Sequence, residues 1–370
     1  MRVRGRAAER AGVPFSPTWV NGATVHGEGT PILESPRSRW IAGIVSVAVV
    51  LAGVGIGVAW TQFRSFDTVE LDPSGARERL QSRGGADDGE LLDPITRNDE
   101  FLTTLILGSD AREGLGGSRA DAIILVVMPP GDDVPVMTSV PRDLWVPNPC
   151  TGGMSRINAG LNGCGSDVSG PDLMTVMVED LAGIEIDHFV ELEFEGFIRI
   201  IDAVGGIELC TENPIRDHRA ELSLPGGCVQ ADGDTALGWV RSRNPQELVD
   251  GTWRPQAGVT ALTRDERQQD VLLSVVGKVS EFGSIGTLRS RVAGLQDAVI
   301  LDSGMSFTRA VGLAWDIRGL DTEDVERVTL PVTGFTTSGG AQVLRAEASL
   351  NELLLEALGR DPDESPGSAD

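Results

Sequence analysis

Four short clusters of charged residues have types and spacings that suit the binding of a phosphate-bearing ligand. They read GSDAREGLGGSRADA (108–122), SVPRDLWVP (139–147), VRSRNP (240–245) and RDERQQ (264–269). The arginines of these clusters are Arg112, Arg119, Arg142, Arg241, Arg243, Arg264 and Arg267. A planar guanidinium can bind two phosphate oxygens in parallel. A single arginine more often forms a surface ion pair, but a set of them beside aspartates at turns favours a pocket for a polyanion.

The spacing within two clusters predicts how their side chains are presented. Arg119 and Asp121 are two residues apart at the entrance to a strand, so their side chains should face the same side. Arg264, Arg267 and Gln268 have the helical spacing i, i+3, i+4, so they should share one face of a helix.

Two carboxylates among the arginines, Asp110 and Asp121, predict a divalent cation. Mg²⁺ prefers oxygen ligands and usually joins one or two carboxylates to substrate phosphates. Arg142 comes just past the end of an expected strand, and ligands bind at that edge of an open α/β sheet. Together these residues describe a diphosphate site with Mg²⁺ as its cofactor.

The composition and the remaining motifs argue against other classes of function. With 31 Lys+Arg and 55 Asp+Glu, the formal net charge is −24, so nucleic acid is not expected as a partner. The glycine-rich stretch 114–117 lacks the Gly-Lys-Ser/Thr of a P-loop. The histidines are His26, His188 and His218, and no G-x-S-x-G elbow accompanies them to support a Ser–His–Asp triad.

Residues 40–60, WIAGIVSVAVVLAGVGIGVAW, predict a transmembrane helix. The segment has no charge and no proline, matches the roughly 30 Å hydrocarbon core of a bilayer, and carries tryptophan at both ends. Arginine outnumbers acidic residues before it, so the positive-inside rule places the N-terminus in the cytoplasm and the rest of the chain outside. A buried core helix or a cleaved signal peptide fits less well, because the apolar run is long and residues 1–39 precede it.

The four cysteines fit an oxidising, extracytoplasmic compartment. Cys150, Cys164, Cys210 and Cys228 form no C-x-x-C pair, which argues against a structural zinc site. Four cysteines allow three disulfide connectivities. Pairing sequence neighbours is the most economical, and each bridge would contribute roughly 3 kcal/mol in the chain-entropy model. Four free buried thiols are the alternative.

Composition also divides the chain into parts. Residues 1–39 are expected to form a cytoplasmic tail, 61–97 a polar spacer, 98–358 the folded domain and 359–370 a disordered acidic tail. Strands are predicted at 101–110, 122–128, 134–140, 188–194, 207–209 and 324–332, and helices at 172–183, 195–206, 234–243, 264–280 and 349–358. This alternation favours an α/β class with helices packed on a mostly buried sheet.

Eight segments, in order, make the chain resemble the LytR-CpsA-Psr proteins of bacterial cell envelopes. They are LILGSDARE, SRADAIILV, SVPRDLWVP, RIN, GIEIDHFVELEFEGFIRIIDAVGGIEL, LPGGC, ALGWVRSR and RDERQQ. The resemblance covers about residues 100–358, and the anchor helix before an external domain matches as well. It implies a three-layer α/β/α-type domain with a mixed central sheet and an apolar groove for a prenyl chain.

The resemblance also implies a reaction. Members of the family transfer glycopolymers from a polyprenyl-pyrophosphate carrier onto peptidoglycan, so the expected partners are this lipid-linked polymer, peptidoglycan and the membrane. A muramic or glucosamine hydroxyl would attack the anomeric carbon, while arginines and Mg²⁺ stabilise the departing pyrophosphate.

Roles follow by motif. Asp110 and Asp121 would hold Mg²⁺, and Asn158 belongs to the motifs without a firm role. The residues implied to surround the pyrophosphate are Arg119, Arg142, Arg241, Arg243, Arg264, Arg267 and Gln268. Those implied to be catalytic are Asp110, Arg119, Asp121, Arg142, Arg264 and Gln268.

The fourth cluster departs from the family pattern D-x-G-R-x-x-R-Q. Ala261 stands where the pattern has aspartate, and Thr263 stands where it has glycine. Asp250, in the long segment before this cluster, is a candidate replacement for the carboxylate. Two alternatives to a transferase therefore stay open: a hydrolase of the same lipid pyrophosphate, and a non-catalytic lipid-carrier binding protein or envelope regulator.

Overall fold

The computed structural model describes residues 67–82, 101–110, 119–129, 134–280, 299–306 and 325–360. The expected cytoplasmic tail, the membrane segment 40–60, Arg112 and residues 361–370 lie outside these ranges. Among the helices within them, none is both long enough and apolar enough to cross a membrane.

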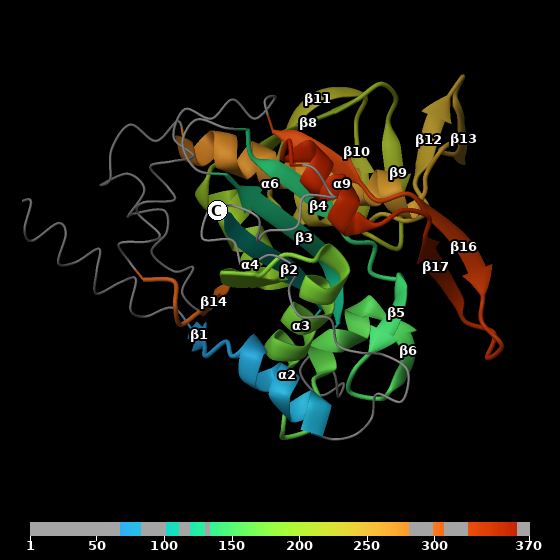
Figure 1. Cartoon of the computed structure of the whole chain (residues 1–370). Helices are drawn as coiled ribbons and strands as arrows, with labels where there is room; N and C mark the ends of the chain where they lie inside the picture. Colours follow the sequence, from blue (N-terminus) through green and yellow to red (C-terminus); the bar gives the residue numbers. More distant parts are fainter. Residues whose placement is uncertain are drawn as a thin grey trace, which may run out of the picture. The chain divides into compact units, whose positions relative to one another are not determined.

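A mixed seven-stranded sheet is the centre of the fold (Figure 1). In spatial order its strands are β1 (Asp67–Val69), β14 (Val299–Asp302), β7 (His188–Glu193), β2 (Leu102–Ser109), β3 (Ala120–Met128), β4 (Val136–Ser139) and β15 (Glu326–Thr329). The pairs β1–β14, β2–β7 and β4–β15 are parallel, and the others are antiparallel. The expected mixed α/β fold is confirmed.

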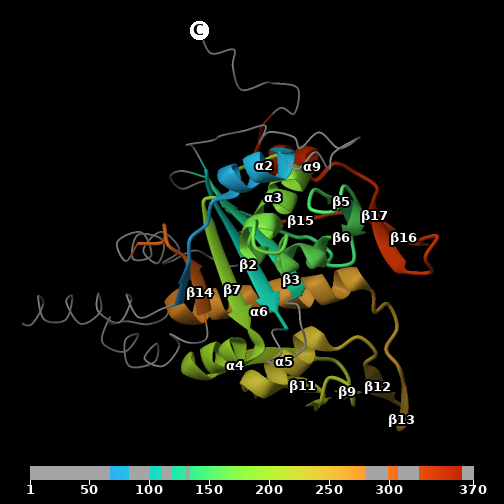
Figure 2. The ribbon, with the colours of Figure 1, turned by 90° about the horizontal axis from the view of Figure 1, so that it is seen from below.

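Helices cover both faces of this sheet, as Figure 2 shows. One face carries α2 (Pro73–Ser82), α3 (Gly170–Ala182) and α9 (Leu350–Ala357), and the opposite face carries α6 (Ala261–Ser280). Alternation along β2 explains this arrangement, because side chains in a strand point to opposite faces in turn. Leu105 and Leu107 lie in the core with α3, while Ile106 packs on the other side with residues of α6.

A second, smaller core lies beyond α6. It joins α4 (Phe194–Ala203) and α5 (Gly233–Arg241) to two small antiparallel sheets. Their strands are β8 (Ile207–Thr211), β11 (Gly227–Ala231), β9 (Ile215–Asp217), β10 (Leu222–Leu224), β12 (Gln246–Val249) and β13 (Thr252–Pro255). Val271 of α6 is buried in this core, so α6 packs against the central sheet on one side and this layer on the other.

Two hairpins and a short 3-10 helix complete the structure. They are β5 (Trp145–Asn148) with β6 (Gly153–Arg156), β16 (Val332–Thr336) with β17 (Gln342–Ala346), and η1 (Ile157–Asn162). The hairpin β16–β17 is tied to the turn after β4, because the Leu344 amide donates to the Asp143 carbonyl at 3.0 Å.

Strong local signals predicted several elements correctly. For α3, the Ser169 side chain accepts a hydrogen bond from the Asp172 amide at the start, and Gly183 adopts the left-handed conformation (φ 66°) at the end. The single strand expected at 324–332 was wrong. The chain forms β15 and β16 there, separated by Leu330 and Pro331, because proline has no amide hydrogen to continue the ladder.

The expected spacer 61–97 was also wrong over residues 67–82. Strand β1 extends the central sheet, and Ala76 and Leu80 of α2 are 0% and 2% exposed in the main core. Arg77 fixes the helix to α3 through Glu179 at 2.9 Å and through Asp180. The polar composition hid a helix whose few apolar residues all face the core.

The position of Leu80 predicts a stability effect. Leu80→Ala should lower the free energy of unfolding by about 3 kcal/mol, because it leaves a cavity between α2 and α3. Urea unfolding followed by tryptophan fluorescence measures it. The matched control is Arg79→Ala, whose side chain is 42% exposed and which should stay within about 1 kcal/mol of wild type. Equal small effects of both substitutions would contradict the placement of α2 in the core.

Candidate functional site

A cavity of about 930 Å³ lies at the edge of the central sheet where β2 ends, β3 begins and β4 ends. Elements on three sides supply its walls: the sheet edge, the β5–β6–η1 segment, and the layer of β9, α5 and α6. Its charged lining residues are Asp110, Arg119, Asp121, Arg142, Asp143, Arg156, Asp217, Arg219, Arg241, Arg243 and Arg264.

The cavity brings together most of the residues that the sequence singled out. Those that line it are Asp110, Arg119, Asp121, Arg142, Asn158, Arg241, Arg243, Arg264 and Gln268. They are spread from Asp110 to Gln268 along the chain, so only the fold makes them neighbours.

A β-bulge presents Asp121 to the cavity. Gly108 of β2 pairs with Ala122 of β3, and Ser109 pairs with Ala120, which leaves Asp121 as the extra residue on β3. Such an extra residue bends the strand and redirects its side chain. The Asp110 amide donates to the Arg119 carbonyl at 3.2 Å and closes this end of the hairpin. Arg119 and Asp121 both line the cavity, but Arg119 precedes β3 and Asp121 is the bulge residue, so the regular strand alternation behind the prediction does not apply.

Carboxylates hold the arginines of the cavity in place. Arg142 forms an ion pair with Asp121, and Arg243 lies 3.9 Å from the same carboxylate. The Oδ2 atom of Asp143 lies 3.5 Å from Nε of Arg142, and its Oδ1 atom lies 3.1 Å from Nε of Arg156. The chain at Arg142 is fixed as well, because the Asn158 amide of η1 donates to its carbonyl at 3.2 Å.

Positive charge nevertheless exceeds negative charge in the lining, with seven arginines and four aspartates. Burial and the neighbouring guanidiniums of Arg142 and Arg264 lower the pKa of Arg243, against the pull of Asp121 and Asp143. Like charges crowded in this way favour binding of an anion, which relieves their repulsion.

Arg267 is a correction to the expected site. It is 8% exposed and does not line the cavity. Its guanidinium lies over the Trp239 ring at 4.1 Å and donates to Oε1 of Gln256 at 3.0 Å. The helical spacing correctly placed Arg264 and Gln268 on the face of α6 that lines the cavity. It could not show that Trp239 of α5 covers Arg267. Arg267 therefore braces α6 against α5 and contributes no surface to the cavity.

Asp217 is a site residue that the sequence did not reveal. Its Oδ2 accepts hydrogen bonds from the Ser242 hydroxyl at 2.8 Å and from the amides of Arg243 and Asn244 at 3.1 and 3.0 Å. Burial alone would raise the pKa of Asp217, but these bonds and one from the Arg219 amide lower it below its ordinary value. One carboxylate thus fixes the turn that carries Arg243. No local pattern around Asp217 signals this long-range contact.

One departure in the fourth cluster, Thr263, has a local role, whereas nothing in the structure explains Ala261. Thr263 pairs with Thr260 at the start of α6, where the amide of each donates to the hydroxyl of the other at 2.9 and 3.3 Å. This reciprocal pairing resembles a capping box. Asp250 is not the replacement carboxylate, because it does not line the cavity; it lies with Gly251 in the tight turn of the β12–β13 hairpin, where both have positive φ.

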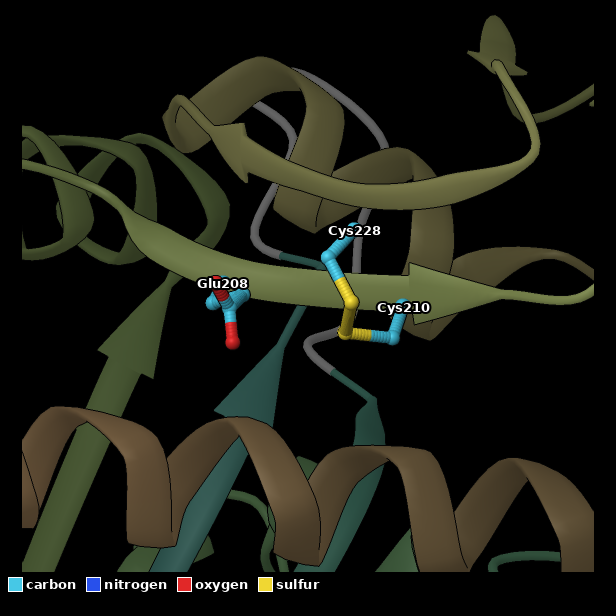
Figure 3. A group of neighbouring side chains, drawn as sticks. All are labelled: Glu208, Cys210 and Cys228. Carbon is cyan, nitrogen blue, oxygen red and sulfur yellow. A yellow bond between two sulfur atoms is a disulfide. The ribbon is translucent and has the colours of Figure 1, made fainter.

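Two carboxylates of the cavity suit a hard divalent cation. Asp110 and Asp121 offer oxygen ligands beside the arginines, which matches the usual protein contribution to a Mg²⁺–phosphate site. Elsewhere in the described ranges, Glu208, Cys210 and Cys228 come close enough together to share an ion. Figure 3 shows that the two cysteine sulfurs are joined to each other, so this group is not a metal site.

Both disulfides join sequence neighbours, as the economical pairing predicted. Cys150 is bonded to Cys164, and Cys210 is bonded to Cys228 between the paired strands β8 and β11. The first bridge encloses β6 and η1, which carry Arg156 and Asn158 into the cavity. The second joins two strands outside the cavity lining.

Comparison with known proteins gives the family. The model of the LytR_cpsA_psr family matches residues 78–358, which is most of the chain. The chain belongs to the LytR-CpsA-Psr family. The resemblance drawn from the motifs is therefore confirmed.

Named relatives agree with this assignment. The chain is 26% identical to the cell wall biosynthesis protein LcpA of Corynebacterium glutamicum over 90% of this chain and 68% of that protein. It is 28% identical to the polyisoprenyl-teichoic acid–peptidoglycan teichoic acid transferase TagU of Oceanobacillus iheyensis over 66% and 71%. A solved LytR-Csp2A-Psr enzyme from Actinomyces oris superposes with a TM-score of 0.57 at 25% identity, covering 70% of this chain and 90% of that one. These relatives support the expected enzyme class, a glycopolymer–peptidoglycan transferase.

The contacts of Asp217 predict that Asp217→Asn loosens the turn that carries Arg243. The single side-chain oxygen of asparagine cannot accept all four hydrogen bonds that the carboxylate accepts. The turn should therefore be stabilised by about 1–2 kcal/mol less in its binding conformation. The affinity for geranyl diphosphate, measured by calorimetry, should fall about 5- to 30-fold. Glu221→Gln removes a charge from an exposed residue outside the cavity and should bind as wild type does. If Asp217→Asn binds geranyl diphosphate as tightly as wild type does, the turn that carries Arg243 does not depend on the hydrogen bonds of Asp217.

The two disulfides predict unequal effects on binding. Replacing Cys150 and Cys164 by serine should cost roughly 3 kcal/mol of stability and also weaken geranyl diphosphate binding, because β6 and η1 lose their closure. Replacing Cys210 and Cys228 by serine should cost similar stability but leave binding intact. Thermal unfolding and calorimetry of both double variants test this, and equal losses of binding would refute the distinction.

Proposed function

We propose that this protein transfers a glycopolymer from a polyprenyl-diphosphate carrier onto peptidoglycan. The observation that carries the proposal is the convergence of Arg142, Arg243 and Arg264, from three separate elements, in one cavity beside Asp110 and Asp121. The name of TagU, a polyisoprenyl-teichoic acid–peptidoglycan teichoic acid transferase, supports the same class of donor and acceptor.

The arginines would hold the diphosphate of the donor. Arg119, Arg241 and Arg243 line the cavity, and guanidinium groups suit phosphate oxygens. Arg241 is braced because its guanidinium lies over the Phe194 ring at 4.5 Å. As the carrier leaves, negative charge grows on the phosphate oxygens, and fixed donors that stabilise this charge lower the barrier.

The acceptor hydroxyl of peptidoglycan supplies the attacking oxygen. This oxygen forms a new bond to the donor, the bond to the carrier breaks with its electron pair staying on the departing phosphate oxygen, and the hydroxyl proton passes to water. Attack at the anomeric carbon releases polyprenyl diphosphate, whereas attack at the sugar-linked phosphorus releases polyprenyl phosphate and leaves one phosphate in the product. The arginine-lined cavity suits both outcomes, and the mass of the product distinguishes them.

Mg²⁺ is proposed as the cofactor, held by Asp110 and Asp121. When bound, it would neutralise charge on the diphosphate. Asp121 also pairs with Arg142, so the same carboxylate would position both an arginine and the ion.

A membrane location completes the proposal. Residues 40–60 would anchor the chain as a single transmembrane helix, with residues 1–39 in the cytoplasm and the domain outside. The two disulfides fit an extracytoplasmic domain. The lipid-linked donor would then reach the cavity from the same membrane.

The test incubates the full-length protein in detergent with MgCl₂, a short-chain prenyl-diphosphate-linked sugar and a soluble peptidoglycan oligomer. Mass spectrometry should find a joined product that a chelator removes. Arg142→Ala should lower the rate about 100-fold or more while circular dichroism stays unchanged. Arg199→Ala, in a helical ion pair with Glu195 outside the cavity, is the matched control and should keep the wild-type rate.

Other outcomes have definite meanings. Free glycan without a joined product would indicate a hydrolase of the same donor. Donor binding without turnover would indicate a lipid-carrier binding or regulatory protein. Full activity of Arg142→Ala would remove this arginine from the mechanism.

A further inference from the structure

Asp265 is a buried carboxylic acid directly behind the arginine-lined cavity. It lies on α6 between Arg264 and Gln268, both of which line the cavity, but its own exposure is 7% and it does not line the cavity itself. Gln269, one helical turn further on the same face, donates to the Ser139 hydroxyl at the end of β4 at 2.9 Å. Asp265 therefore faces the interior on the side where β4 leads into Arg142.

The carboxyl of Asp265 has little local support for a negative charge. Its Oδ2 is buried and has no hydrogen-bond partner among the residues that the structure describes. A buried ionised carboxylate without hydrogen bonds is costly. Asp217 provides the contrast in the same site, because its hydrogen bonds offset the cost of burial.

Charged groups face Asp265 from two elements. Arg264 and Glu266 are on its own helix, and Arg142 and Asp143 are on the turn after β4. Burial raises the pKa of Asp265 to about 7, the arginines oppose this shift, and the acidic neighbours add to it. The balance is therefore set by the same arginines that line the diphosphate cavity.

We propose that Asp265 is a proton-coupled residue of the diphosphate site: it takes up a proton from solvent when a diphosphate occupies the cavity and releases it when the diphosphate leaves. The inference rests on the proposed function, because it needs an anionic ligand at the arginines. In the empty cavity, Arg264 and Arg142 favour the ionised carboxyl. A bound diphosphate screens this attraction and adds negative charge nearby, so the neutral acid becomes the favoured form.

The sign of the pH dependence follows. Below pH 7 the carboxyl already carries its proton, and the diphosphate binds without further cost. Above pH 7 the carboxyl of the empty site is ionised and must be protonated on binding, so affinity falls as the pH rises. The loss between pH 6 and pH 8 reaches about tenfold if the proton is fully retained in the complex.

The experiment measures binding of geranyl diphosphate, with MgCl₂, to the full-length protein by calorimetry at pH 6, 7 and 8. Asp265→Asn mimics the neutral acid, and Asp265→Leu removes the titrating group in a second way. Glu221→Gln removes a charge from an exposed residue that lies outside the cavity and does not act on Asp265, and it is the matched control. Protonation of geranyl diphosphate itself affects all four proteins equally. Differences between their pH profiles therefore measure the titration of Asp265.

The wild type and Glu221→Gln should lose up to about tenfold more affinity between pH 6 and pH 8 than the two Asp265 variants do. Parallel profiles for all four proteins would overturn the role of Asp265 and leave the proposed function standing. Absence of binding in the wild type at every pH would instead contradict the proposed diphosphate site, and this inference with it.

Discussion

The guanidinium groups of the cavity repel one another, and the fold has to hold them together against this repulsion. Seven arginines line a space of about 930 Å³ in a chain whose net charge is −24. Burial lowers the pKa of Arg243, and the neighbouring Arg142 and Arg264 lower it further. An anionic ligand would relieve this repulsion.

Three aspartates distribute this charge in different ways. Asp121, redirected by the bulge in β3, pairs with Arg142, while Asp143 joins Arg142 to Arg156. Asp217 acts on the backbone, because it accepts hydrogen bonds from the amides of Arg243 and Asn244 and so fixes the turn after α5. The cavity is thereby shaped before any ligand arrives, which reduces the cost of ordering it on binding.

The same contacts connect the cavity to distant parts of the chain. The turn after β4 bonds to η1 through the carbonyl of Arg142 and to β17 through the carbonyl of Asp143. The Cys150–Cys164 bridge closes the segment that contains η1. Helix α6 presents Arg264 to the cavity while its apolar residues pack in two cores. Displacing any of these elements would therefore move an arginine.

The amino-acid sequence alone determined the α/β class and the helix that forms α3, and it predicted anion binding by the charged clusters. These depend on local signals: alternating apolar residues, helical spacing that ends at Gly183, and guanidiniums beside carboxylates. Only the tertiary structure decided which members of each cluster meet. It turned Arg267 onto Trp239, placed α2 in the core, and brought Asp217 to the turn at Arg243. Such contacts join residues far apart in the chain or on different elements, so neither spacing nor composition encodes them.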